Sequence, residues 1–84
     1  RLELFSYNGI AQKAAFWLLM QARQTGNNKV LIPESISKWA MLINVSRPSL
    51  HRELKRLAEQ SVISYDPPII HILDQDALQD VLSQ

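Results

Sequence analysis

Residues 36–57 read ISKWAMLINVSRPSLHRELKRL and are predicted to form two helices separated by a short turn. The first helix is predicted to start after Ser35, which acts as its N-cap, and to run to about Leu42. The second is predicted to start after Ser46, also an N-cap, and to run to about Gln60. Two helices joined by so short a turn form a helix-turn-helix.

The start of the second helix carries the clearest local signals. Pro48 falls in the first turn, where a missing N–H costs nothing. Val45 before the cap and Leu50 after it match a hydrophobic staple. Apolar residues then recur at helical spacing and predict one buried face on each helix. The residues expected to face inward are Ile36, Trp39, Ala40 and Ile43 in the first helix, and Leu50, Leu54 and Leu57 in the second.

Two further elements are predicted on the N-terminal side of this unit. Residues 8–25 show the spacing of an amphipathic helix, with Ser6 or Asn8 as the expected cap. Gly26 is expected to stop that helix. Residues 30–32 are a short run of Val, Leu and Ile, which favours a strand.

The C-terminal side changes to the period of a β-hairpin. Residues 62–65 and 69–73 are rich in β-branched residues, and the sequence Asp-Pro-Pro at 66–68 is typical of a turn between them. Asp74 or Asp76 is expected to cap a short final helix. The predicted fold class is therefore mainly α with a small β-hairpin, as in a winged helix-turn-helix.

The composition fits one small domain over residues 1–84. Hydrophobic residues make up 46% of the chain, and the absence of cysteine excludes disulfides and thiolate chemistry. The apolar run at 14–20 is far too short to cross a bilayer, so no membrane partner is expected. Because the sequence starts at Arg1 without a signal-peptide pattern, we expect a domain of a longer cytoplasmic protein.

The net charge of +1 hides a strong asymmetry along the chain. The chain has 9 basic and 8 acidic residues, and every basic residue lies at or before Arg56. Residues 1–60 carry nine basic and four acidic residues, a balance of +5, whereas residues 61–84 carry four acidic residues alone, a balance of −4. An asymmetry of this kind is a feature of chains that bind nucleic acid or a membrane surface.

A helical wheel of the second helix separates an apolar face from a cationic one. With Arg47 at 0°, the three leucines fall at about 280–340°. Pro48 and the polar or basic residues His51, Arg52 and Lys55 fall at about 40–140°, and Arg56 falls near 180°. A helix held by its apolar side can offer the other side to the major groove of DNA.

The residue types on that face indicate separate roles. Arg47 and Arg52 are expected to contact bases, because a guanidinium matches O6 and N7 of guanine. Ser49 and the free N–H groups of the first turn are expected to bind a phosphate. Further contacts with the DNA backbone or groove are expected from Ser46, His51, Lys55 and Arg56.

These residues also resemble a known family, the Crp/Fnr bacterial transcription regulators. Ala40 holds the small position of the family's first helix, and the Val-Ser-Arg sequence at 45–47 keeps its turn and cap. Arg52 matches the second arginine of the family motif, and the Leu-Lys-Arg-Leu sequence at 54–57 matches its tail. The sequence from Val62 to Asp74 is similar to the family's wing and closing aspartate, and that around Gln12 and Lys13 to its upstream helix.

Two single positions and the wing turn depart from the family pattern. The turn glycine is replaced by Asn44, which tolerates the left-handed conformation better than most residues. The glutamate that follows the first arginine is replaced by Pro48, for which we expect an apolar base contact, for instance with a thymine methyl. In the wing, Asp-Pro-Pro at 66–68 replaces a glycine and basic residues, which argues against phosphate contacts there.

The resemblance also implies which further domains the protein has and which partners it binds. It implies an N-terminal effector-sensing domain and a dimerisation helix outside this sequence, with a small-molecule effector bound there and no cofactor in residues 1–84. It implies a homodimer on a pseudo-palindromic DNA site, in the bacterial cytoplasm, and RNA polymerase as a further partner. The two half-sites would lie about 34 Å apart.

Other classes of function are weighed against DNA binding. A cationic helix face can be an ordinary solvated surface, and a winged helix can also be a protein-interaction module or a structural domain that binds no DNA. An enzyme is not expected, since no glycine-rich loop or nucleophile pattern is present. No metal site is expected either, because His51 and His71 lie far apart, with His71 expected to point outward from the wing.

Overall fold

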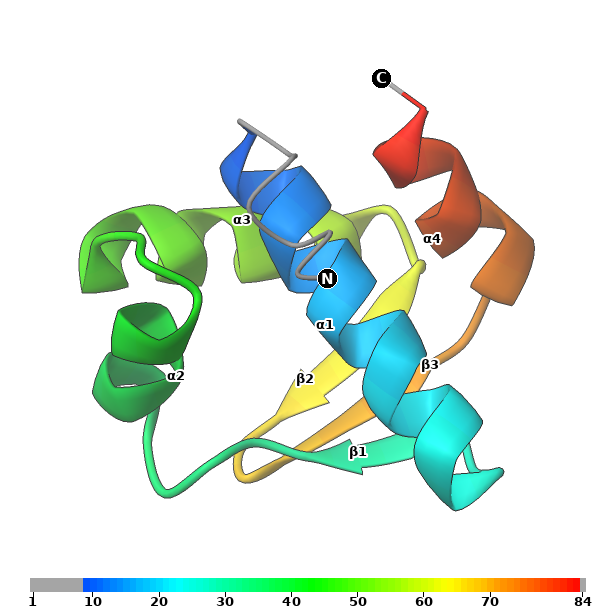
Figure 1. The fold of residues 1–84 in the computed structure, drawn as a ribbon. Coiled ribbons are helices and arrows are strands. Elements are labelled where there is room, and N and C mark those ends of the chain that lie inside the picture. The colour runs from blue at the N-terminus through cyan, green and yellow to red at the C-terminus, as the bar shows by residue number, and fades with distance from the viewer. Residues whose placement is uncertain (1–8, 84) are drawn as a thin grey trace.

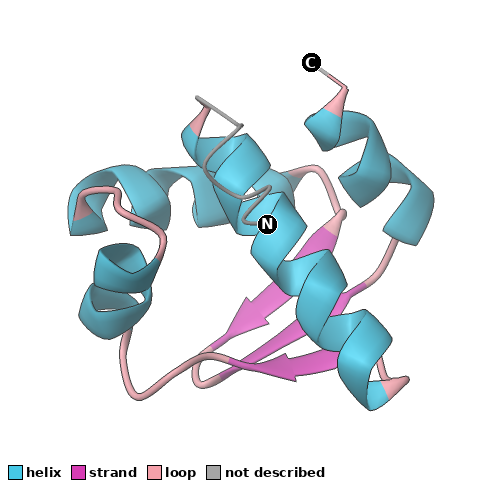
Figure 2. Ribbon diagram, viewed as in Figure 1, coloured by secondary structure: helices cyan, strands magenta, loops and turns pink. Residues whose placement is uncertain are grey.

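The computed structural model of the chain describes residues 9–83. Its elements are, in chain order, α1 (Ile10–Thr25), β1 (Lys29–Leu31), α2 (Ile36–Leu42), α3 (Arg47–Glu59), β2 (Ile63–Asp66), β3 (Ile69–Ile72) and α4 (Gln75–Leu82). This is the order that the sequence predicts. Figure 1 shows α1 crossing in front of the sheet, with α2 at one side of the molecule and α4 at the other. The predominance of helix over strand is plain in Figure 2.

The first helix starts later than predicted. Its N-cap is Gly9, whose backbone N–H donates to Oε1 of Gln12 at 3.1 Å. Ser6 and Asn8, the expected caps, lie outside the described residues. The stop at Gly26 is confirmed: its φ of 67° is left-handed, and its N–H donates to the carbonyl of Ala22 at 2.8 Å.

The helix-turn-helix forms as its caps predict. Oγ of Ser35 accepts from the N–H of Lys38 at 3.1 Å, and Oγ of Ser46 accepts from the N–H of Ser49 at 3.3 Å. In the turn between the helices, Asn44 has a φ of 61°, so this residue does take the left-handed conformation of the glycine it replaces. The caps set where each helix begins, and the left-handed residue lets the chain turn from one helix to the next.

The wing is a three-stranded sheet and not only a hairpin. β3 pairs antiparallel with both β2 and β1, in the order β1-β3-β2, so that Val30 and Tyr65 lie on either side of Ile70. β1 covers residues 29–31 where 30–32 was predicted. The predicted turn was too long, because Asp66 belongs to β2 and pairs with Ile69. The predicted cap of α4 is Asp74, whose Oδ1 accepts from the N–H of Ala77 at 3.0 Å.

The core gathers apolar residues from all seven elements. Trp39 of α2 is fully buried and lies against Trp17 of α1, with ring centroids 4.9 Å apart. Ile36 is only half-buried, whereas the other predicted inward residues of α2 and α3 are buried: Trp39, Ala40, Ile43, Leu50, Leu54 and Leu57. Burial of these side chains anchors one face of each helix, and leaves the opposite face of α3 in solvent.

Candidate nucleic-acid interface

The outer face of α3 is a continuous exposed surface, hereafter the α3 face. Its exposed residues are Arg47, Pro48, His51, Arg52 and Lys55. The three leucines on the other side of the helix have no exposed surface. The predicted division of α3 into an apolar side and a cationic side is therefore confirmed. The structure brings together the predicted base-contacting residues on one accessible surface.

The basic side chains of α3 differ in whether they have an ion-pair partner. Nη2 and Nε of Arg56 both lie 2.9 Å from Oε1 of Glu53, one helical turn earlier. Within residues 9–83 no ion pair is formed by Arg47, Arg52 or Lys55. These three side chains therefore offer full charges to an anionic partner, whereas the charge of Arg56 is already balanced and its side chain is half-buried.

The N-terminus of α3 offers less to a phosphate than the sequence predicts. The Ser49 N–H is taken by the hydroxyl of Ser46, and the Leu50 N–H donates to the Ser46 carbonyl at 3.0 Å. Pro48 has no N–H. In the described part of the chain, the backbone N–H of Arg47 is therefore the only N–H of the first turn that has no acceptor. The expected phosphate contact by several free N–H groups thus reduces to one N–H.

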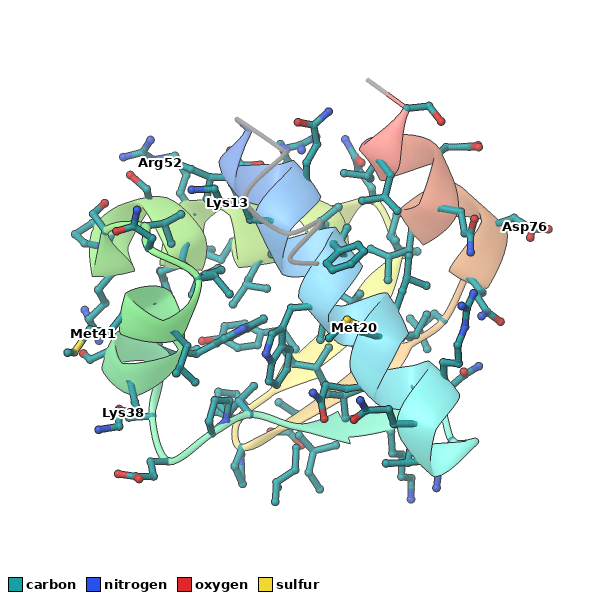
Figure 3. The ribbon with its side chains drawn as sticks, viewed as in Figure 1. Lys13, Met20, Lys38, Met41, Arg52 and Asp76 are labelled. Atoms are coloured by element: carbon teal, nitrogen blue, oxygen red, sulfur yellow. The ribbon has the colours of Figure 1, made fainter. Side chains whose placement is uncertain are left out.

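A lysine that we did not predict as a site residue lies beside the helix-turn-helix turn. Nζ of Lys13, in α1, donates to the carbonyl of Asn44 at 3.4 Å. Figure 3 shows Lys13 and Arg52 on the same side of the molecule. An ammonium at the end of α2 is electrostatically favourable, since the carbonyl end of a helix is negative. The basic residue in the upstream helix was the only sequence signal for this contact.

The wing contributes an aromatic residue that the sequence analysis also missed. The ring of Tyr65, in β2, meets the imidazole of His51 edge to face, with centroids 5.9 Å apart. Burial raises the pKa of the Tyr65 phenol above its ordinary 10.0, and the nearby Arg47 guanidinium partly opposes that shift. Tyr65 therefore joins the wing to the first half of α3.

The outer face of the sheet carries a mixed set of side chains. Lys29, Ser64 and His71 form one cross-strand row, and Asp66 and Ile69 form the next. Together they line a shallow hollow of about 220 Å³. His71 points outward, as predicted. Among residues 9–83, no group of three His, Asp or Glu residues could hold a metal ion, and no helix there has the length and apolar character needed to span a bilayer.

The charge division along the sequence is partly kept in space, although Arg23 at the end of α1 lines a hollow with Gln79 and Leu82 of α4. Figure 3 shows Lys13, Lys38 and Arg52 at the side formed by the start of α1, by α2 and by α3, with Asp76 of α4 at the far side. The described carboxylates of α4 and its cap are Asp74, Asp76 and Asp80, all exposed. The cations of the helix-turn-helix side therefore attract an anionic partner more than the α4 side does, where three carboxylates are exposed.

The fold and this surface together define a winged helix-turn-helix domain with an exposed cationic second helix. The family model described as the Crp-like helix-turn-helix domain matches residues 12–81. The chain therefore belongs to the Crp-like helix-turn-helix family, a family of DNA-binding domains of transcription regulators and not of enzymes. No curated protein matches the sequence.

Solved structures of the same fold cover nearly the whole chain. A transcriptional regulator of the Crp/Fnr family from Eubacterium rectale is similar over 98% of this chain, with a TM-score of 0.82 and 18% identity. The catabolite activator protein of Thermus thermophilus is similar over 96%, with a TM-score of 0.77 and 25% identity. A second Thermus thermophilus protein, a transcriptional regulator of the CRP family, is similar over 96%, with a TM-score of 0.81 and 18% identity. The chain spans only 37%, 37% and 44% of these three proteins, respectively.

Proposed function

We propose that this domain binds double-stranded DNA sequence-specifically, with α3 inserted in the major groove. The observation that carries the proposal is the α3 face, where three unpaired cations are exposed on the side opposite three buried leucines. A helix presented in this way fits the major groove in width and in charge.

The residues of the α3 face have distinct proposed roles. Arg47 and Arg52 read base edges, and Pro48 makes an apolar contact such as one with a thymine methyl. His51, Lys55 and the two serines at the helix start, Ser46 and Ser49, contact the DNA backbone. Arg56 contributes least, because Glu53 already balances its charge. The wing tip contributes little, since Asp66 repels phosphate and the two prolines after it have no N–H to donate.

We further propose that the domain belongs to a longer, homodimeric bacterial regulator. In that protein a small-molecule effector binds outside residues 1–84, and two copies of the domain read a pseudo-palindromic site in the cytoplasm. The half-site spacing of about 34 Å places both α3 helices on one side of the duplex. RNA polymerase is the proposed protein partner. These proposals extend the family relationship to parts of the protein beyond this chain.

Selection of bound sequences from random double-stranded DNA, with the full-length protein, tests the function. We expect a defined site to be enriched. Arg47→Ala and Arg52→Ala should each weaken binding to that site by about 1–3 kcal/mol and leave binding to random DNA nearly unchanged. Arg23→Ala is the matched control, because it removes the same charge from an exposed residue near the end of α1. Normal binding by both α3 variants would refute groove insertion.

One observation favours a second function, a protein-interaction module without DNA binding. Met41 and Leu42 are adjacent large apolar residues of α2 and are 74% and 53% exposed, and a contiguous exposed apolar patch is a feature of protein-interaction sites. The two functions differ in salt dependence. Binding to DNA phosphates weakens steeply as salt rises, so the absence of salt-dependent affinity for any duplex would exclude DNA binding and leave an interaction module or a structural domain.

A further inference from the structure

The seam between α3 and the wing is built around Tyr65. In the antiparallel register Tyr65 lies opposite Ile70, which is fully buried, so both side chains project from the inner face of the sheet. β2 is an edge strand and packs against α3. The ring is therefore half-buried between the sheet edge and the helix, where its contact with the imidazole of His51 confines both rings.

The phenol end of Tyr65 lies in the field of Arg47. Arg47 lies four positions before His51, on the same side of α3, so the imidazole that Tyr65 contacts is a helical neighbour of Arg47. The positive charge of that guanidinium also acts on the phenol, because it lowers the pKa of Tyr65 against the larger effect of burial. Among the residues that the structure describes, neither the Tyr65 hydroxyl nor the Arg47 guanidinium makes a side-chain hydrogen bond. A phenol oxygen can accept from a guanidinium N–H, so the hydroxyl can hold that side chain in one direction without neutralising its charge.

The orientation of the Arg47 side chain matters because its proposed role is to contact a base. A bidentate contact with guanine needs the planar fork of the guanidinium in one orientation. A free arginine side chain at a helix surface samples many rotamers, and ordering it on binding opposes affinity. A neighbour that restricts those rotamers beforehand strengthens binding to the correct base more than binding to random sequence, where no bidentate contact forms.

On the basis of the proposed DNA-binding function, we propose that Tyr65 is a positioning residue for sequence discrimination, which directs Arg47 and His51 toward the major groove. The wing thus acts on DNA recognition through β2 and not through its tip. The tip carries Asp66 and two prolines and has no cation.

The test uses the full-length protein with two duplexes, the sequence selected from random DNA and a scrambled one of equal length. Tyr65→Phe keeps the ring and removes the hydroxyl, and should weaken binding to the selected duplex about threefold. Tyr65→Leu removes the contact with His51 as well and should weaken it about tenfold. Binding to the scrambled duplex should change less than about twofold in both variants. Ile69→Ala is the matched wing control, since that side chain lies on the outer face of the sheet.

A double variant separates positioning from a merely structural role. If Tyr65 acts through Arg47, Tyr65→Phe should cause no further loss in an Arg47→Ala background. Full additivity of the two losses overturns the proposal, and so does a parallel loss on both duplexes, which indicates a phosphate contact or a damaged fold. Thermal unfolding of each variant identifies the damaged fold.

The failure of this inference is distinguishable from the failure of the proposed function. If Arg47→Ala and Arg52→Ala lose binding to the selected duplex while both Tyr65 variants bind both duplexes normally, DNA recognition stands and the role of Tyr65 is overturned. If no sequence is enriched, or if the two arginine variants bind normally, groove insertion fails and the inference fails with it.

Discussion

The helices α3 and α4 are built by the same physical means and present opposite surfaces. Each starts at a side chain that accepts from a backbone N–H of its first turn, Ser46 in α3 and Asp74 in α4. Each buries apolar residues against the common core. Yet the exposed side of α3 carries unpaired cations, whereas that of α4 carries Asp76 and Asp80. The comparison teaches that caps and apolar spacing make the helix, while the exposed charges decide what it can bind.

The largest effect is expected from truncation of buried leucines, which tests whether α3 and α4 contribute equally to stability through their buried faces. Leu54 in α3 and Leu78 in α4 both have no exposed surface. Leu54→Ala and Leu78→Ala should each lower the free energy of unfolding by about 2–5 kcal/mol, because each leaves a cavity. Denaturant titration measures the loss. Leu73→Ala is the control, since Leu73 is 57% exposed and its removal should cost less than about 0.5 kcal/mol.

Substitutions at the two helix caps should lower stability alike but affect DNA binding differently. Ser46→Ala and Asp74→Ala each leave a first-turn N–H without its side-chain acceptor and should each cost about 1 kcal/mol of stability. Only Ser46→Ala should also weaken binding to the selected DNA, because Ser46 caps the helix that carries the α3 face and is itself a proposed contact with the DNA backbone. Thermal unfolding and duplex titration on the same samples measure both effects. Equal loss of DNA binding in the Asp74 variant would contradict the assignment of DNA contacts to α3.

The charges of the two helices should differ in their effect on salt dependence. Lys55→Gln removes an unpaired exposed cation of α3 and should make the slope of log affinity against log salt shallower by about 0.9. Asp80→Asn changes the net charge by the same amount in the opposite sense, on α4, and should leave the slope unchanged. Titrations of one duplex at several salt concentrations check both. Equal shifts in the two variants would mean that net charge, and not the α3 face, governs binding.

The smallest expected effect concerns alkaline stability at the seam with the wing. Burial raises the folded-state pKa of Tyr65 above its ordinary value of 10.0, so folding favours the neutral phenol. The stability that this shift contributes is complete below pH 10 and is lost as the pH rises through the folded-state pKa. Tyr65→Phe should therefore lose less stability than the wild type as the pH rises above that range. Chemical unfolding at each pH checks this, and identical pH profiles would count against the shift.

Much of the fold could be predicted, because the deciding signals are local. The caps at Ser35 and Ser46, the stop at Gly26 and the leucine spacing of α3 each depend on residues within a few positions of one another. The exposed cations of α3 follow from the same spacing. Predictions were weakest at helix starts where several neighbouring residues could serve as the cap, as for α4, which starts at Asp74, and for α1, which starts at Gly9.

The parts that could not be predicted depend on contacts between distant segments. The sequence shows β1 only as a short apolar run, and its pairing with β3 joins residues that are about 40 positions apart. The contact of Lys13 with the Asn44 carbonyl likewise spans 31 positions. Local patterns also suggested several free N–H groups at the start of α3, and the way that Ser46 uses its hydroxyl and carbonyl left only one.

The amino-acid sequence by itself determined the helices, the turn and the cationic side of α3, because caps, helical spacing and turn residues act over a few positions. The tertiary structure alone decided which groups stand beside that surface. Packing of the sheet edge against α3 placed Tyr65 against His51 and near Arg47. It also placed Asp76 of α4 on the far side of the molecule from Lys13, Lys38 and Arg52. These relations arise only when the core closes, because burial of apolar side chains from every element brings distant segments together.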